Sequence, residues 1–177
     1  MKDQSRTNQD LLEEILLLKQ KIRKLELSEK EHLQTLEVLK RSEAKFRTLY
    51  DSTSDAVLLM DQNRFFDCNN AALKMFGCAT RAELCGMHPA SMSPLVQPCG
   101  TESRVLSDRH IAAAVKNGMH QFEWVHKRAD TGEEFPCDVL LSPMIIDGRP
   151  VLQAVVRDIT ERKRMEEELI KAKEKAE

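Results

Sequence analysis

The sequence has little net charge of either sign. Its formal net charge is −2, and basic residues alternate with acidic residues instead of clustering. A protein that attracts nucleic acid carries a basic patch or stripe, so this pattern excludes the usual electrostatic basis for binding DNA or RNA. Nucleic acid is not an expected partner.

Long apolar runs are also absent. No stretch approaches the roughly 18 apolar residues that span a membrane, and the first residues form no apolar signal-peptide core. We therefore expect a cytoplasmic chain with no membrane span. The cysteines are odd in number and irregularly spaced, which is typical of reduced thiols rather than a disulfide framework. They are Cys68, Cys78, Cys85, Cys99 and Cys137.

Recognisable catalytic motifs are missing as well. The sequence has no glycine-rich phosphate loop, no nucleophile beside a recognisable base and no paired carboxylates in a motif. Glu133 and Glu134 are adjacent, but they lie at a predicted turn and indicate a solvated surface. We expect that this chain is not an enzyme.

Residues 10 to 47 contain no glycine or proline, the residues that most often interrupt a helix. Apolar residues recur there at alternating spacings of four and three, typical of a coiled-coil seam that becomes imperfect at Glu29, His32 and Glu43. A helix of about 37 residues is about 55 Å long, longer than a small domain is wide. This length favours a coiled-coil helix over residues 1–45 rather than a helix packed on one core. The apolar seam residues are Leu11, Ile15, Leu18, Ile22, Leu25, Leu36, Leu39 and Phe46.

Residues 46–160 alternate short apolar runs with turn signals and are predicted to form one α+β domain. The turn signals are Gln62-Asn63, residues 130–132 and Asp147-Gly148. The predicted strands are 55–61, 64–69, 120–128, 134–142 and 150–159. The predicted helices are 70–77, 80–84, with a capping box from Thr80 to Glu83, and 107–118. These elements predict one antiparallel five-stranded sheet with short helices on one face.

The order of these elements, together with several short motifs, resembles a PAS domain. The motifs are DAVLLMD, NNAALKMFG, HKRADTGEEFP and VVRDITERK, and the last resembles the D-I-T sequence that closes this family's domain before a signalling helix. The resemblance implies a sheet that closes over a small ligand pocket, dimerisation through flanking helices and output into a C-terminal helix. The segments SPLVQPCG and FEWVHKR also resemble a PAS subgroup of bacterial sensor histidine kinases and diguanylate cyclases.

A signalling junction is predicted at Asp158, Ile159 and Thr160, where the last strand passes into a charged helix over residues 161–177. We expect Thr160 to cap the helix and Asp158 to pair with Arg162 four residues later. Met165, Leu169, Ala172 and Ala176 give this helix its own narrow seam. By resemblance, such a helix enters an output domain that this chain lacks, so the chain is expected to be part of a longer protein.

Strand alternation predicts which side chains face the helices and could line a pocket. Phe122 and Trp124 share one face with His120 and His126. An apolar lining of this kind occurs in plain cores as well as in ligand sites, so both interpretations stay open. The candidate ligand-binding residues are Leu58, Met60, Phe76, Phe122, Trp124, Val139, Leu141 and Ala154.

No cofactor is required by these patterns. His110 begins a predicted helix in the region where haem-binding PAS domains carry an axial histidine, but the surrounding pattern is missing. The flavin-reactive motif N-C-R-F-L-Q is absent. Cys85, His88 and Cys99 could be imagined as a zinc site, but one C-x-x-H without a second ligand pair favours ordinary thiols.

Three function classes remain. The leading hypothesis is a non-catalytic sensory and dimerisation PAS module, a parallel homodimer with a possible small-molecule ligand. It would relay a signal to an output domain, with the histidine kinase of a two-component system favoured. The alternatives are a coiled-coil adaptor that binds only protein, and a haem-binding redox or gas sensor.

Overall fold

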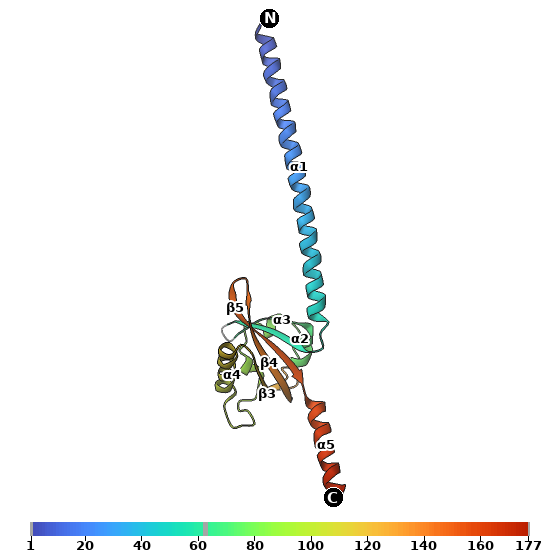
Figure 1. Cartoon of the computed structure of the whole chain (residues 1–177), viewed down its shortest axis with the longest axis vertical. Coiled ribbons are helices and arrows are strands. Elements are labelled where there is room, and N and C mark those ends of the chain that lie inside the picture. The colour runs from blue at the N-terminus through green and yellow to red at the C-terminus, as the bar shows by residue number, and fades with distance from the viewer. Residues whose placement is uncertain (1, 62–63, 177) are drawn as a thin grey trace. The chain divides into compact units, whose positions relative to one another are not determined.

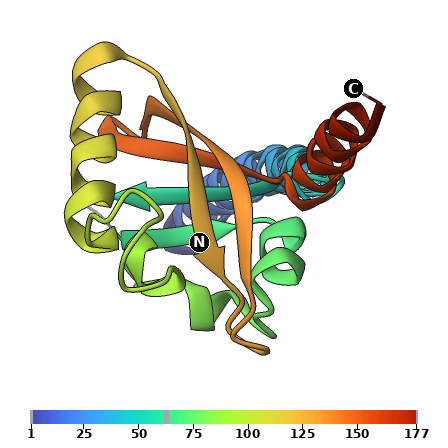
Figure 2. The same cartoon turned by 90° about the horizontal axis from the view of Figure 1, so that it is seen from below.

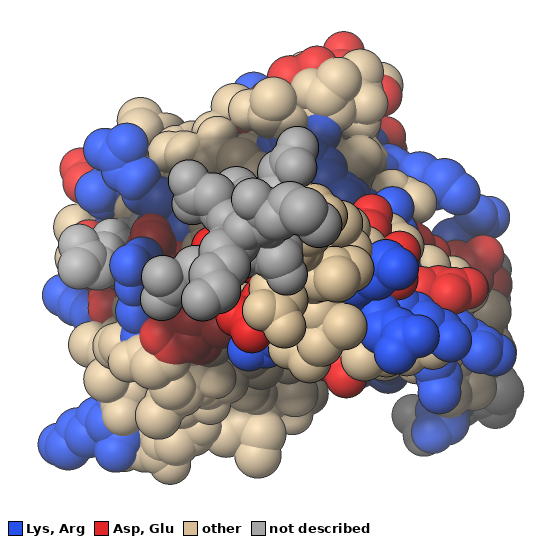
Figure 3. All heavy atoms as spheres, turned by 90° about the horizontal axis from the view of Figure 1, so that it is seen from above, with Lys and Arg blue, Asp and Glu red and all other residues tan. Residues whose placement is uncertain are grey.

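The computed structural model describes residues 2–61 and 64–176. It divides the chain into two compact units, Met1–Thr48 and Leu49–Glu177. Within the described residues, no helix combines the length and the apolar character needed to cross a membrane. On the face shown in Figure 3, Lys and Arg side chains lie among Asp and Glu side chains.

A single helix, α1 (Lys2–Asp51), accounts for the whole N-terminal segment (Figure 1). It continues past the boundary predicted at residue 45, because nothing in the sequence interrupts it before Ser52. There the hydroxyl of Ser52 donates to the carbonyl of Leu49 at 3.0 Å, and that of Thr53 donates to the carbonyl of Tyr50 at 3.2 Å. These bonds satisfy carbonyl groups that the end of a helix leaves open.

The predicted five-stranded antiparallel sheet is confirmed, with the strand order β2-β1-β5-β4-β3. Its first and last strands in sequence, β1 and β5, are central neighbours, and Leu58 lies opposite Ala154 in their register. The residues of the predicted turn at Gln62-Asn63 lie outside the described part. The strands are β1 (Ala56–Asp61), β2 (Arg64–Cys68), β3 (His120–Lys127), β4 (Glu134–Ile146) and β5 (Arg149–Asp158).

The helices between β2 and β3 pack on one face of this sheet (Figure 2). The longest, α4, begins at Ser103 rather than at the predicted residue 107, because the chain pairs at Val96 and Glu102 just before it and turns into the helix there. The helices are α2 (Asn70–Phe76), α3 (Arg81–Leu84), the 3₁₀ turn η1 (Pro89–Met92) and α4 (Ser103–Asn117). The last helix, α5 (Thr160–Ala176), follows β5.

The capping box predicted at α3 does not form, because Glu83 bonds the residue before the N-cap instead of the N-cap Thr80 itself. The Glu83 carboxylate accepts the backbone N–H of Ala79 at 3.0 Å. The Thr80 hydroxyl does not cap the helix backbone, since it donates to the same carboxylate at 3.1 Å. The glycine stop of α2 is confirmed, because Gly77 adopts the left-handed conformation with φ of 68°.

Asn69 is a fully buried polar residue that joins several segments. Its amide nitrogen donates to the carbonyls of Tyr50 and Asp55, and its oxygen accepts the backbone N–H groups of Val57 and Ala72. This one side chain therefore fixes the connection from the end of α1 into β1 and also caps α2. No local sequence pattern indicates this combined role.

Candidate functional site

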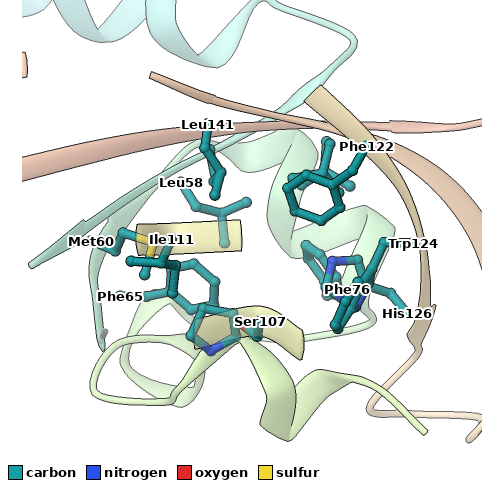
Figure 4. A pocket seen from close by; sticks show the side chains of 14 residues that line it. Leu58, Met60, Phe65, Phe76, Ser107, Ile111, Phe122, Trp124, His126 and Leu141 are labelled. Atoms are coloured by element: carbon teal, nitrogen blue, oxygen red, sulfur yellow. The ribbon is translucent and has the colours of Figure 1, made fainter. Parts of the chain in front are cut away.

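A cavity lies between the inner face of the sheet and the helices that cover it (Figure 4). The free volume of this cavity is only about 30 Å³, enough for a few waters at most. All eight residues predicted as candidate pocket residues line it. The lining is Leu58, Met60, Phe65, Phe76, Pro89, Ser107, Ile111, Phe122, Trp124, His126, Val139, Leu141, Ala154 and Val156.

Strand alternation explains why the sequence predicted these positions together. In β3, Trp124 and His126 are buried, whereas the intervening Val125 is only partly covered and Glu123 is exposed. The residues of β4 and β5 on the same face are buried in the same alternation, as in Val139 and Ala154. The face predicted from period-two spacing is therefore the face that the structure turns toward the helices.

Several lining residues were not among the candidates. Ser107 and Ile111 come from α4, whose length and register the sequence did not give, and Pro89 comes from the 3₁₀ turn η1. His126 was predicted on the correct face of its strand but not among the pocket residues, and Phe65 and Val156 were not among them either. Ser107 and Ile111 are four residues apart and so lie on one face of a helix. This spacing is the one sequence signal that could have added them to the candidate pocket residues.

A polar network supports the base of the cavity. The indole N–H of Trp124 donates to Ser93 Oγ at 2.9 Å, and His126 Nδ1 lies 2.9 Å from the carbonyl oxygen of Met92. The ring of Phe76 meets that of His126 edge-on at 4.9 Å between centroids. Burial among these groups lowers the pKa of His126 to about 4, so the ring is neutral at physiological pH.

His110, considered above as a haem ligand, is engaged by protein groups. Its Nδ1 lies 2.8 Å from Nε2 of His120, and its ring stacks on Phe122 at 3.7 Å between centroids. Burial lowers the pKa of His110, and the neighbouring His120 lowers it further. Of these three rings, the ring of Phe122 is the one that belongs to the cavity lining.

The residues imagined as a zinc site are not gathered into one. His88 uses both ring nitrogens within the protein, since Nε2 lies 3.1 Å from Asp108 Oδ1 and Nδ1 accepts the N–H of Ala90. Cys99 is exposed, whereas Cys85 is half-buried. Within residues 2–61 and 64–176, no group of three or more His, Cys, Asp or Glu side chains is placed to hold a metal ion.

The signalling junction differs from its prediction in the identity of the cap. Asp158 Oδ1 accepts the backbone N–H of Thr160 at 2.9 Å and also its hydroxyl, so Asp158 rather than Thr160 provides the capping oxygen. The predicted pairing of Asp158 with Arg162 is wrong as well. Asp158 pairs with Arg128 at 3.2 Å, because strand β4 brings the β3–β4 connection beside the end of β5. The third junction residue, Ile159, is buried.

Arg162 reaches β3 instead. Its guanidinium contacts Glu123 at 2.8 Å, and Lys163 contacts the other oxygen of the same carboxylate at 2.5 Å. Lys163, followed by Arg162, holds the pKa of the Glu123 carboxyl below its usual range. Glu123 lies between Phe122 and Trp124 in sequence, so one strand contacts both the cavity and the first turn of α5.

Comparison with known proteins agrees with this architecture. The chain is 28% identical over 133 residues to the diguanylate cyclase DgcM of Escherichia coli K12, a match that covers 73% of this chain and 30% of that protein. The chain thus matches about a third of the length of this curated relative.

Solved structures with the same fold include the PAS domain of an HTR-like protein from Haloarcula marismortui. It has a TM-score of 0.60 at 16% identity, covering 71% of this chain and 98% of that one. A PAS domain from a two-component sensor histidine kinase has a TM-score of 0.54 at 16% identity, covering 67% and 98%. The profile of the PAS domain matches residues 54–161, more than half of the chain. The chain belongs to the PAS domain family.

Proposed function

We propose that this chain is a non-catalytic, cytoplasmic sensory and dimerisation module in which the state of the cavity biases helix α5. The observation that carries the proposal is the alternation in β3. Phe122 and Trp124 line the cavity, and Glu123 between them bonds Arg162 and Lys163 in the first turn of α5. In this proposal α5 has two arrangements, and each goes with a different position of β3. An occupant that binds more tightly to the cavity in one of them would favour that arrangement.

The output is a signalling enzyme joined to α5. Sequence motifs favoured a histidine kinase, and the similarity to a diguanylate cyclase supports a cyclase equally well. In both cases the catalytic residues belong to the output domain, and the role of this chain is to set its activity.

The module works as a parallel homodimer. The seam residues of α1 expose apolar surface, and Met165 and Leu169 of α5 are 65% and 57% exposed. Side chains of this kind are buried when two such helices pair in register. A parallel arrangement keeps the two α5 helices together at the point where they meet the output domains.

A double-mutant cycle tests the relay. The chain is fused through α5 to a cyclase domain, and Ala154→Val serves as a built-in occupant because it adds methyl groups inside the cavity. We expect Ala154→Val to change the rate of cyclic dinucleotide formation, and Glu123→Gln to remove most of that change. The matched control is Glu168→Gln, which breaks the exposed pair with Arg164 farther along the same helix. An equal response to Ala154→Val with and without Glu123 would contradict the proposed route.

A further inference from the structure

The described residues that line the cavity are apolar except for two, Ser107 of α4 and His126 of β3. Both residues are largely buried, with 6% and 5% of their surface exposed. Figure 4 shows Ser107 in the lower part of the cavity and His126 beside Trp124 and Phe76. Polar groups so placed in an apolar site determine how a ligand is oriented.

The hydrogen bonds of His126 determine which ring nitrogen carries the proton. The carbonyl oxygen of Met92, 2.9 Å from Nδ1, can only accept, so Nδ1 must be the donor. The Ser93 hydroxyl does not compete for this role, because it directs its own proton to the carbonyl of Pro89 at 3.4 Å. Burial keeps the ring neutral at pH 7 by lowering its pKa to about 4. Nε2 is therefore an unprotonated acceptor.

Neither His126 Nε2 nor Ser107 Oγ has a hydrogen-bond partner among the described residues. In the same part of the chain, no fully enclosed side-chain nitrogen or oxygen is left without a partner. Both atoms must therefore be accessible, and the cavity that their residues line offers free space beside them. A buried acceptor that stays unpaired destabilises the folded state, so an occupant that donates a hydrogen bond is favoured there.

We propose that the cavity selects a small, neutral, mostly apolar molecule that carries one O–H or N–H donor, which bonds to His126 Nε2 while Ser107 bonds the same polar group. This inference rests on the sensory function proposed above and names its ligand class. Among the described residues, no charged side chain lines the cavity to compensate a charged ligand, so ions are disfavoured. The small free volume restricts the occupant to a few non-hydrogen atoms.

The test compares 2-propanol with acetone, which have the same heavy-atom skeleton but differ in that only the alcohol donates. Each is titrated into the full chain while the NMR signals of the cavity methyl groups of Leu58, Leu141 and Val139 are followed. We expect saturable binding with a preference of about tenfold for 2-propanol, the size of one net hydrogen bond. The preference should disappear in His126→Phe and weaken in Ser107→Ala. It should persist in the control Ser91→Ala, which removes the same hydroxyl from an exposed position.

A second measurement does not depend on the fold of a variant. Nitrogen-15 spectra of the imidazole rings in the parent chain should show His126 Nε2 as an unprotonated nitrogen whose signal moves on addition of 2-propanol but not of acetone. A proton on Nε2, equal binding of the two compounds, or no saturable shift with either would each overturn the inference. The last outcome would mean that the cavity holds water only. Equal binding would leave the relay through Glu123 intact, since the fusion experiment tests that relay without any ligand.

Discussion

The two units of this chain differ in how far their apolar side chains are exposed. In α1, Ile15 is 47% exposed and Leu39 is 62% exposed, although both lie in the predicted seam. In the unit from Leu49 onward, Leu58 and Phe76 are at most 1% exposed. A helix has no interior in which to bury a side chain, whereas a sheet covered by helices creates one. We therefore expect the first unit to pair with a partner, whereas the second completes its own core.

Removing α1 should produce the largest effect, a change of oligomeric state. We expect the full chain to be a dimer at micromolar concentration and the chain lacking residues 1–40 to be a monomer, because the long seam is then gone. Light scattering measures both, and circular dichroism should show the sheet unchanged. A monomeric full chain would show that the coiled-coil prediction is wrong. A truncated chain that stays dimeric would place the interface in the second unit.

Truncation of Trp124 should be the most damaging single change in the second unit. Trp124→Ala removes a large buried side chain and leaves Ser93 without its indole donor, so we expect a loss of about 3 to 5 kcal/mol in the free energy of unfolding. Urea denaturation followed by far-ultraviolet circular dichroism gives this value. The control is Phe66→Ala, which removes a ring that is 42% exposed and should cost much less. Similar losses in the two variants would contradict the assignment of Trp124 to the core.

Acid should weaken the second unit through His126. Its pKa in the folded state is about 4, below the ordinary histidine value of 6.5, so the unfolded chain takes up a proton first as the pH falls. The contribution of the neutral His126 ring to stability is complete above about pH 6.5 and is lost progressively toward pH 4. We expect the free energy of unfolding to fall by about 2 kcal/mol between pH 7 and pH 5. Urea denaturation at both values measures the loss, which His126→Phe should reduce. An identical pH dependence in that variant would assign the loss to other groups.

At the junction between β5 and α5, the structure makes Asp158 and not Thr160 the residue that caps the helix. Asp158→Ala removes the oxygen that binds the N–H of Thr160, so we expect the first turn of α5 to lose about 0.5 to 2 kcal/mol. Thr160→Ala leaves that bond in place and should have a smaller effect. Hydrogen exchange of the first-turn amides separates the variants. If Thr160→Ala accelerated exchange more than Asp158→Ala, the threonine would be the cap after all.

The smallest expected effect is a gain of stability in α1. Glu29 and Glu43 occupy seam positions, where dimerisation would bury a carboxylate at a cost in free energy. Replacing both with leucine should raise the melting temperature of the dimer. The control replaces Glu31 and Glu37, which lie outside the seam, and should not stabilise pairing. An equal rise in both variants would show that added hydrophobicity, rather than the seam register, is responsible.

Much of the fold could be predicted because it depends on local patterns. The alternating four and three spacing of apolar residues, without glycine or proline, predicted α1, and the period-two spacing in β3 placed Phe122 and Trp124 on the inner face. Helix boundaries were predicted less well. The start of α4 at Ser103 depends on a bridge between Val96 and Glu102, which no local pattern in a proline-rich segment reveals.

The sequence by itself determined which faces are apolar and where strand becomes helix. Only the tertiary structure decided which polar groups meet. Asp158 pairs with Arg128 and Arg162 with Glu123, partners that lie 30 and 39 residues away in the chain. The side-chain direction of a residue follows from backbone periodicity, which is local. The choice among several equivalent charged partners follows from strand order. The sheet places side by side residues that are distant in the sequence, and no sequence spacing reveals such pairs.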